Sequence, residues 1–178
     1  MNALADMLAR SRFYGAKSEP IDAVDVVREA EVDGVRLLIL RVHHGGRSDL
    51  YQVLVDAADN DVLHHPAVIR PYGAALTAGT PAGFGTLHGS AEGLDGGGTA
   101  IQGEQSNTSL IFGEQAMVKV FRRLEAGQNP DVELLSQIDD CPNVAPVRGW
   151  VTETIDGEEY TLAMVQDFVP DADDGWRY

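Results

Sequence analysis

The sequence predicts an α+β fold in which antiparallel β-sheets carry a few short helices. Strand-like apolar runs come in pairs separated by two-residue turns such as Asp33-Gly34 and Asp156-Gly157, and such turns connect antiparallel strands. The stretch from Thr77 to Gly103 contains nine glycines and few apolar residues, so it has little core to bury. We therefore expect two α+β subdomains that divide near residue 95, covering 1–95 and 96–178.

The first subdomain is predicted to be an antiparallel meander with one helix on its face. The helix covers residues 3–13, where Leu4, Met7 and Leu8 share one face at helical spacing. Alternating and continuous apolar runs then predict three strands. These strands are Val24–Ala30, Val35–Val42 and Leu50–Val55.

The second subdomain is predicted to contain two hairpins separated by a helix. Gly113-Glu114 favours a two-residue type II′ turn, because glycine occupies the first central position. Asn129 is a good helix N-cap, and Pro130 suits the first helical position. The predicted helix ends at Pro142 and buries Val132, Leu135 and Ile138, and residues 124–128 before it form a loop. The predicted strands are Ser109–Phe112, Ala116–Phe121, Val147–Thr154 and Tyr160–Gln166.

The charge balance excludes two classes of partner. The chain of 178 residues has 13 Lys and Arg against 28 Asp and Glu, a formal net charge of -15. Nucleic acids and anionic membrane surfaces bind clustered cations, so we expect neither as a partner. One cysteine, Cys141, cannot form an internal disulfide, and we find no secretory signal and no apolar run long enough to span a membrane. We therefore expect a cytoplasmic protein.

Three features of the second subdomain occur in an order that suggests phosphate binding. The polar loop Gly103-Glu104-Gln105-Ser106-Asn107-Thr108 leads into a strand, and its hydroxyl, amide and backbone N–H groups can hold phosphate oxygens. Lys119 lies in the middle of the next strand, on the face of Met117 and Phe121. Glu133 lies on the following helix. In kinases, a strand lysine holds the nucleotide phosphates and pairs with a helix glutamate.

These residues carry a resemblance to the actinobacterial maltokinases, which have the kinase fold of the aminoglycoside phosphotransferases. EQSNTSLIF and MVKVFRRLEAGQNPDVEL are similar to the corresponding family segments. Arg12-Phe13-Tyr14-Gly15 resembles an early signature of the family, with Phe13 in place of the usual tryptophan. Leu50–Val53 resembles a strand of the family's N-terminal cap, and 164–176 resembles the hinge and the start of the large lobe.

The resemblance implies a maltokinase-like cap, 1–95, followed by a protein-kinase-like small lobe, 96–178, that ends just past the hinge. The implied chemistry is the formation of maltose 1-phosphate from maltose and ATP with Mg²⁺, which feeds glycogen synthesis, and association with trehalose synthase is also implied. Lys119 would contact the phosphates and Glu133 would orient it, while Asp167 and Val169 would meet the adenine edge. The implied phosphate-loop residues are Ser106, Asn107, Thr108 and Ser109.

The family's catalytic aspartate and magnesium ligands fall in a large lobe beyond Tyr178, so no catalytic residue is assigned and the chain alone is expected to be inert. His88-Gly89-Ser90 is no substitute, because serine cannot accept a proton as a carboxylate does. Two alternatives stay open: a standalone module with an interaction or regulatory role, and the matching part of an aminosugar (glucosamine) kinase. No tightly bound cofactor is expected.

Other polar residues are assigned no site. The adjacent pairs His43-His44 and His64-His65 point to opposite faces of a strand and suit no single metal. The acidic cluster of the tail, 171–174, lacks the spacing of a calcium loop and is interpreted as a solvated helix start. Arg122-Arg123 is interpreted as surface charge near the helix.

Overall fold

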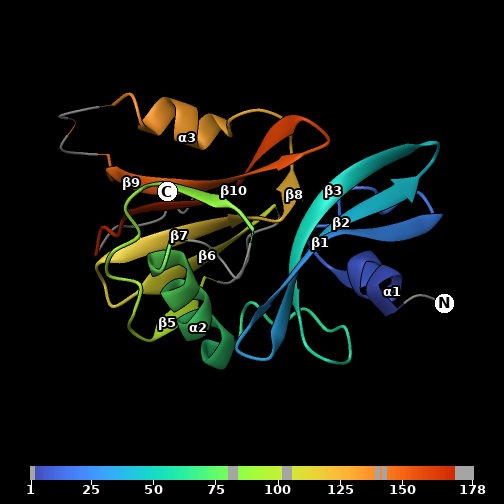
Figure 1. Ribbon diagram of the computed structural model, residues 1–178, viewed down its shortest axis with the longest axis horizontal. Coiled ribbons are helices and arrows are strands. Elements are labelled where there is room, and N and C mark those ends of the chain that lie inside the picture. Colours follow the sequence, from blue (N-terminus) through green and yellow to red (C-terminus); the bar gives the residue numbers. More distant parts are fainter. Residues whose placement is uncertain (1–2, 80–83, 102–105, 139–140, 142–143, 171–178) are drawn as a thin grey trace, which may run out of the picture.

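The computed structural model describes residues 3–79, 84–101, 106–138, 141 and 144–170. The fold is mixed α+β, as predicted, with two antiparallel sheets and three helices in these residues. Figure 1 shows the two sheets side by side. In chain order the elements are α1 Ala3–Arg10, β1 Ala23–Val32, β2 Val35–His44, β3 Arg47–Val55, α2 Pro66–Thr77, β4 Thr86–Gly89, β5 Gly98–Ala100, β6 Asn107–Phe112, β7 Ala116–Phe121, β8 Arg123–Leu124, α3 Pro130–Leu135, β9 Val147–Ile155 and β10 Glu158–Asp167.

The first sheet has the strand order β1-β2-β3-β8, and its central strands β2 and β3 are largely buried on both faces. Alternate residues of β2 and β3 pack against α1 on one side, among them Leu38, Leu40 and Val53. The intervening residues, among them Leu37, Ile39 and Leu54, join the core of the second sheet. The continuous apolar run in β2 follows from this, because a strand covered on both faces needs apolar side chains in both directions.

The second sheet has the order β4-β9-β10-β7-β6-β5, and burial along its strand β7 alternates as the sequence predicts. In β7, Ala116, Val118 and Val120 are fully buried, whereas Met117 and Lys119 on the other face are only partly buried. In Figure 1, α3 lies along β9 and β10 and α2 lies near β5 and β6.

Helix α2 was not predicted, because Pro71 and Gly73 in its sequence argue against a helix. Gly73 is required by packing: a Cβ there would lie 2.4 Å from the carbonyl oxygen of Leu94 and 2.5 Å from the ring of Phe112. Glycine therefore lets α2 approach the second sheet closely. Gly98 on β5 serves the same contact, since its Cβ would lie 2.4 Å from Cγ2 of Ile69.

The glycine-rich stretch contributes more to the core than predicted. It contains β4 and β5, and Phe84 and Leu94 are buried. The division near residue 95 stays a prediction, but it does not coincide with the division between the sheets. Strand β4 precedes residue 95 and pairs in the second sheet, whereas β8 follows it and pairs in the first.

Two local predictions were wrong. Gly113 and Glu114 both have positive φ, 54° and 57°, which is the geometry of a type I′ turn and not of type II′. Helix α3 begins as predicted, with the Asn129 side chain accepting a hydrogen bond from the Asp131 N–H. It ends at Leu135, well before Pro142, and leaves Ile138 43% exposed.

The two sheets meet where the chain passes from β7 to β8. Arg122 is the residue between these strands, and it is fully buried, so its interpretation as surface charge was wrong. Its guanidinium contacts Asp61 at 2.5 Å and lies 4.2 Å from the centre of the Phe13 ring. The Gln52 N–H donates to the Arg122 carbonyl at 2.8 Å.

Gln52 is the polar residue on the face of β3 that packs against the second sheet. Its side-chain amide is 1% exposed and donates to the carbonyls of Phe121 at 3.1 Å and Leu162 at 2.9 Å. Leu162 lies at a register irregularity between β9 and β10. The amide thus donates to backbone carbonyls of two strands in the other sheet. Buried carbonyls need such a donor.

We predict that Gln52→Leu lowers the free energy of unfolding by about 2 kcal/mol or more, because two buried carbonyls lose their donor. Urea unfolding measures the change. Gln137→Leu, at an exposed position, is the control and should change stability by less than about 0.5 kcal/mol. Equal effects of the two substitutions would contradict a role for Gln52 at the junction.

Candidate functional site

The predicted phosphate-binding residues lie at one end of the β6–β7 hairpin. Ser106 is exposed, Asn107 and Thr108 are half-buried, and Ser109 is buried. Ser109 is directly opposite Lys119 in the antiparallel ladder, and Lys119 is opposite Met164 on its other side. Residues 103–105 of the predicted loop lie outside the described residues. The fold therefore places the start of β6 beside the strand that carries Lys119.

Lys119 forms its ion pair with Asp131 and not with Glu133. The Lys119 Nζ lies 2.5 Å from Asp131 Oδ2, whereas Glu133 is exposed. The predicted Lys119–Glu133 pair was therefore wrong by two residues along the helix. The Asn129 cap starts α3 at Pro130, and both Asp131 and Glu133 lie in its first turn, where the helix dipole favours a carboxylate. The placement of the helix, and not its cap, therefore selects Asp131.

The predicted adenine-edge residues lie at the end of β10 and just after it. Asp167 is opposite Ala116, three positions along the strand from Met164, the partner of Lys119. Its N–H donates to the Pro146 carbonyl at 2.9 Å, and its carboxylate pairs with Arg148. Val169 is 51% exposed. The structure brings Lys119 and Asp131 together but engages the Asp167 N–H within the chain.

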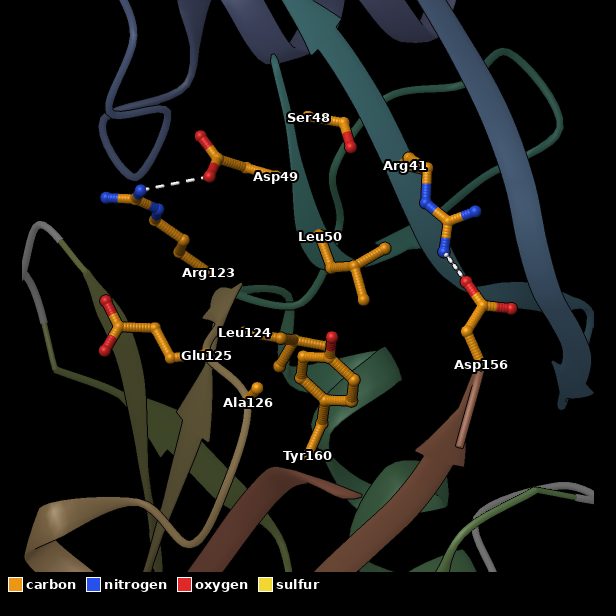
Figure 2. A pocket seen from close by; sticks show the side chains of 10 residues that line it. All are labelled: Arg41, Ser48, Asp49, Leu50, Arg123, Leu124, Glu125, Ala126, Asp156 and Tyr160. Carbon is orange, nitrogen blue, oxygen red and sulfur yellow. Dashed lines mark hydrogen bonds and ion pairs between the residues drawn. The ribbon is translucent and has the colours of Figure 1, made fainter. Parts of the chain in front are cut away.

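A polar cavity of about 560 Å³ lies at the junction of the two sheets. Figure 2 shows its lining, in which Arg41 points to Asp156 and Arg123 points to Asp49. Both arginines are therefore neutralised by carboxylates of the chain. The cavity also contains Ser48, Glu125 and Tyr160, and this lining has no excess of positive charge that would suit an anion.

The Arg12-Phe13-Tyr14-Gly15 segment is held against the first sheet. Tyr14 is buried, with its ring centre 5.4 Å from that of Tyr51, and the Gly15 N–H donates to the Tyr51 hydroxyl at 3.2 Å. Phe13 lies beneath the guanidinium of Arg122. The segment that resembled a family signature thus contacts the residue at which the two sheets join.

A buried histidine fixes the chain just after this segment. His44 is fully buried, with Nδ1 2.8 Å from Glu19 Oε2 and Nε2 2.9 Å from Asp49 Oδ2. Arg47 pairs with Glu19 at 2.9 Å, and Arg123 pairs with Asp49 at 3.1 Å. These five side chains form a network that joins the N-terminal loop to β2, β3 and β8.

The network shifts the pKa values of its members. The hydrogen bond with Glu19 raises the pKa of His44 above 6.5, against the opposing effect of burial. The same bond lowers the pKa of Glu19 below 4.5. Burial acts to raise the pKa of Asp49, but hydrogen bonds from His44 and Arg123 outweigh it and leave the pKa below 3.8. A charged His44 between two carboxylates is the favoured state.

The remaining histidines of the sequence analysis make local contacts. His88 contacts the Thr152 hydroxyl at 2.9 Å and stacks on Trp150, and the rings of His64 and His65 are 4.3 Å apart. Over the described residues, no group of three His, Cys, Asp or Glu side chains could hold a metal ion, and no helix is long and apolar enough to cross a membrane. The acidic tail, 171–178, lies outside the described residues.

The first sheet precedes an antiparallel second sheet that carries the lysine strand β7. This arrangement defines the class of fold: the N-terminal part of a kinase-like protein with a cap. Comparison with known proteins gives a family-model match for the cap. Residues 7–93 match the family model described as the maltokinase N-terminal cap domain, which confirms the recognition made from the sequence.

Solved structures support the same fold over nearly the whole chain. A glucosamine kinase in complex with glucosamine, ADP and inorganic phosphate matches with a TM-score of 0.64 and 18% identity, covering 97% of this chain and 42% of that one. Glucosamine kinase in crystal form A matches with a TM-score of 0.63 and 17% identity, covering 98% of this chain and 43% of that one. The chain thus spans about two fifths of the length of these kinases.

Sequence reasoning missed the residues that organise the junction. Gln52 is a polar residue between apolar ones in a predicted strand, and that pattern is the signal that could have identified it. Arg122 precedes a second arginine, Arg123, and carries no such signal. His44 was considered only as half of an adjacent pair. Its carboxylate partners, Glu19 and Asp49, lie 25 and 5 residues away, and no local spacing indicates the first of these.

We predict a pH-dependent contribution of His44 to stability. Its folded pKa is raised, so its stabilisation is complete below about pH 6.5 and is lost as pH rises through the folded pKa. Glu19 and Asp49 have lowered pKa values. Their contribution to stability is therefore present above the ordinary values of 4.5 and 3.8 and is lost on acidification. The stability difference between wild type and His44→Gln should therefore be largest between about pH 4.5 and 6.5.

Urea unfolding of both proteins across this range and at alkaline pH measures that difference. It should shrink on the alkaline side, and an NMR titration of His44 should give a midpoint above 6.5. A difference that is constant with pH would show that His44 is neutral in the folded protein and would contradict the network.

A double-mutant cycle distinguishes the two possible partners of Lys119. We predict a coupling energy of about 0.5 kcal/mol between Lys119→Met and Asp131→Asn, since the pair is partly exposed. The matched cycle with Glu133→Gln should show no coupling beyond error. Coupling to Glu133 but not to Asp131 would contradict the observed ion pair.

Proposed function

We propose that this chain is the N-terminal portion of an ATP-dependent sugar kinase, with a cap sheet and a nucleotide-binding small lobe. The observation that carries the proposal is the ion pair of Lys119 with Asp131 on the strand that pairs with Ser106–Ser109. A strand lysine held by a helix carboxylate is the arrangement that positions nucleotide phosphates in kinases. The maltokinase cap match and the glucosamine kinase neighbours support the same class.

The nucleotide-binding residues that we propose are the polar start of β6 and Lys119. Ser106, Asn107, Thr108 and Ser109 supply hydroxyl, amide and backbone donors, and Lys119 supplies the cation. Asp131 takes the orienting role that Glu133 was expected to have. Asp167 and Val169 are proposed to line the adenine edge through their backbone, which for Asp167 requires exchange of its bond to Pro146.

The preferred acceptor is maltose, giving maltose 1-phosphate for glycogen synthesis, because the cap match is to maltokinases. Glucosamine is the second candidate, because the solved structures with the same fold are glucosamine kinases. Mg²⁺ would neutralise the phosphates in the complete enzyme, where a large lobe supplies its ligands. Association with trehalose synthase follows only from the family resemblance. An exposed, unpaired Cys141 supports placement in a reducing cytoplasm.

We predict millimolar affinity of the chain for Mg-ATP. The chain supplies one wall of the proposed nucleotide cleft. Losing ~4 kcal/mol of binding free energy with the other wall would move a micromolar site into the millimolar range. The net charge of -15 also opposes a polyanion at low salt. An NMR titration should shift the amide signals of Ser106–Ser109 and of the strand around Lys119.

Lys119→Ala should remove these shifts, whereas Lys17→Ala, at the other lysine of the chain, should leave them in place. Shifts that are the same in wild type and Lys119→Ala would contradict the nucleotide site. Micromolar binding lost in Lys119→Ala would show that the small lobe is a complete site and would refute the incomplete cleft.

We also predict that the chain alone transfers no phosphate from ATP to maltose or glucosamine. The reaction needs a carboxylate base and metal ligands to position the acceptor and neutralise the transferring group, and the family positions for these lie beyond Tyr178. Chromatographic detection of sugar phosphate provides the assay. Robust product formation by residues 1–178 would overturn the proposed division of roles.

A further inference from the structure

Arg148, near the start of β9, lies where four segments of the chain meet. Its Nε lies 2.5 Å from Asp167 Oδ1 at the end of β10. Its Nη1 donates to the Glu92 carbonyl at 3.1 Å, in the loop after β4, and its Nη2 donates to the Gln115 carbonyl at 2.9 Å, in the turn between β6 and β7. All three nitrogens of the guanidinium are therefore engaged, and its rigid planar fork fixes the relative positions of the three acceptors.

The loop that carries Glu92 is packed against β9 at two glycines. A Cβ on Gly149 would lie 2.5 Å from the carbonyl oxygen of His88, and a Cβ on Gly89 would lie 2.4 Å from that of Arg148. Such close approach of two backbones requires residues without a side chain. Part of the glycine-rich stretch therefore serves to bring this loop, and with it the Glu92 carbonyl, to Arg148.

The end of β10 is held by the same group of contacts. The Asp167 N–H donates to the Pro146 carbonyl at 2.9 Å, and the Phe168 N–H donates to the Gln115 carbonyl at 3.1 Å. The Gln115 carbonyl thus accepts from both Arg148 and Phe168. Arg148 therefore fixes the end of β10 twice, through the side chain of Asp167 and through the carbonyl that binds the next residue.

Val169 is the first residue after β10 whose N–H is free for a ligand. It is 51% exposed, and it forms no backbone hydrogen bond to another residue in the described part of the chain. Its position is therefore set by the two residues before it, which Arg148 and Gln115 hold. A backbone edge that recognises a ligand must stay within about 0.5 Å of the productive geometry, so these contacts bear directly on binding.

We propose that Arg148 is a positioning residue for the nucleotide base, because it holds the chain segment 167–169 in place. The inference rests on the proposed nucleotide site and adds to it a residue that acts through Asp167 and Val169. The ion pair also neutralises the Asp167 carboxylate, whose charge would otherwise oppose a polyanionic ligand. Glu92 lies in the matched cap segment, 7–93, so Arg148 also connects the cap to the base-binding edge.

The test is an NMR titration of the chain with Mg-ATP and with Mg-tripolyphosphate, which has three phosphates but no adenosine, at constant ionic strength. Wild type should bind Mg-ATP about threefold or more tightly than Mg-tripolyphosphate, since base contacts add to phosphate contacts. Only Mg-ATP should shift the Val169 amide. In Arg148→Gln the two affinities should become equal, with the Ser106–Ser109 shifts retained. A wild-type affinity ratio in Arg148→Gln would overturn the proposal.

Arg28→Gln is the matched control, because Arg28 makes the same set of bonds elsewhere in the fold. Its Nε pairs with Glu153 at 3.0 Å, and its Nη1 and Nη2 donate to the carbonyls of Val27 and Thr154. The variant thus loses the same charge, one ion pair and two carbonyl bonds, and it should keep the wild-type affinity ratio. An equal loss of the ratio in both variants would show a general effect and would refute the role of Arg148.

Other outcomes separate the possible failures. If Arg148→Gln does not fold, Asp167→Ala decides, because it removes the ion pair at a partly exposed carboxylate and should lower the affinity ratio in the same direction. An unchanged ratio there would overturn the proposal. Equal binding of the two ligands by wild type would refute the base edge and leave the phosphate site standing. If neither ligand shifts Ser106–Ser109, the proposed nucleotide site itself is wrong, and the role of Arg148 falls with it.

Discussion

The structure depends on the passage of the chain from one sheet to the other at Arg122. The residue lies between β7 and β8, and its backbone carbonyl accepts from Gln52 while its buried guanidinium is paired with Asp61 and stacked on Phe13. Leaving a buried cation unpaired costs several kcal/mol, so Asp61 and Phe13 must both stay in place. Gln52 extends the same junction by donating to Phe121 and Leu162. The cap and the small lobe therefore share one hydrophobic core and one set of buried polar contacts.

These contacts link the cap to the proposed nucleotide site. The Ser106 carbonyl accepts from the Arg122 N–H at 3.2 Å, so the start of β6 is tied to the residue that also contacts the cap segment at Phe13. A movement of Arg12–Lys17 would thus reach the proposed phosphate-binding strand through two contacts. The His44 network holds this segment from its other side and adds a dependence on pH.

Sequence patterns predicted the elements whose rules are local. The hairpins, the Asn129 cap and the alternation around Lys119 follow from turn chemistry, capping and strand periodicity, and the structure has them. Helix α2 was missed because Pro71 and Gly73 are helix breakers in isolation and are explained only by contact with Leu94 and Phe112. The partner of Lys119 was misassigned because Asp131 and Glu133 are both acidic residues of one helical turn, and only the packing of α3 separates them. The burial of Arg122 depends on strand order, which no local pattern contains.

The central claim is that the two sheets form one cooperative unit around the Gln52–Arg122 junction. Native-state amide hydrogen exchange in increasing denaturant tests this most directly, because it gives an opening free energy for each strand. The account predicts that the slowest amides of β2, in the cap sheet, and of β7, in the second sheet, exchange with the same free energy, that of global unfolding. A lower opening free energy for either strand, with the other still protected, would show that the sheets unfold separately and would contradict the shared core.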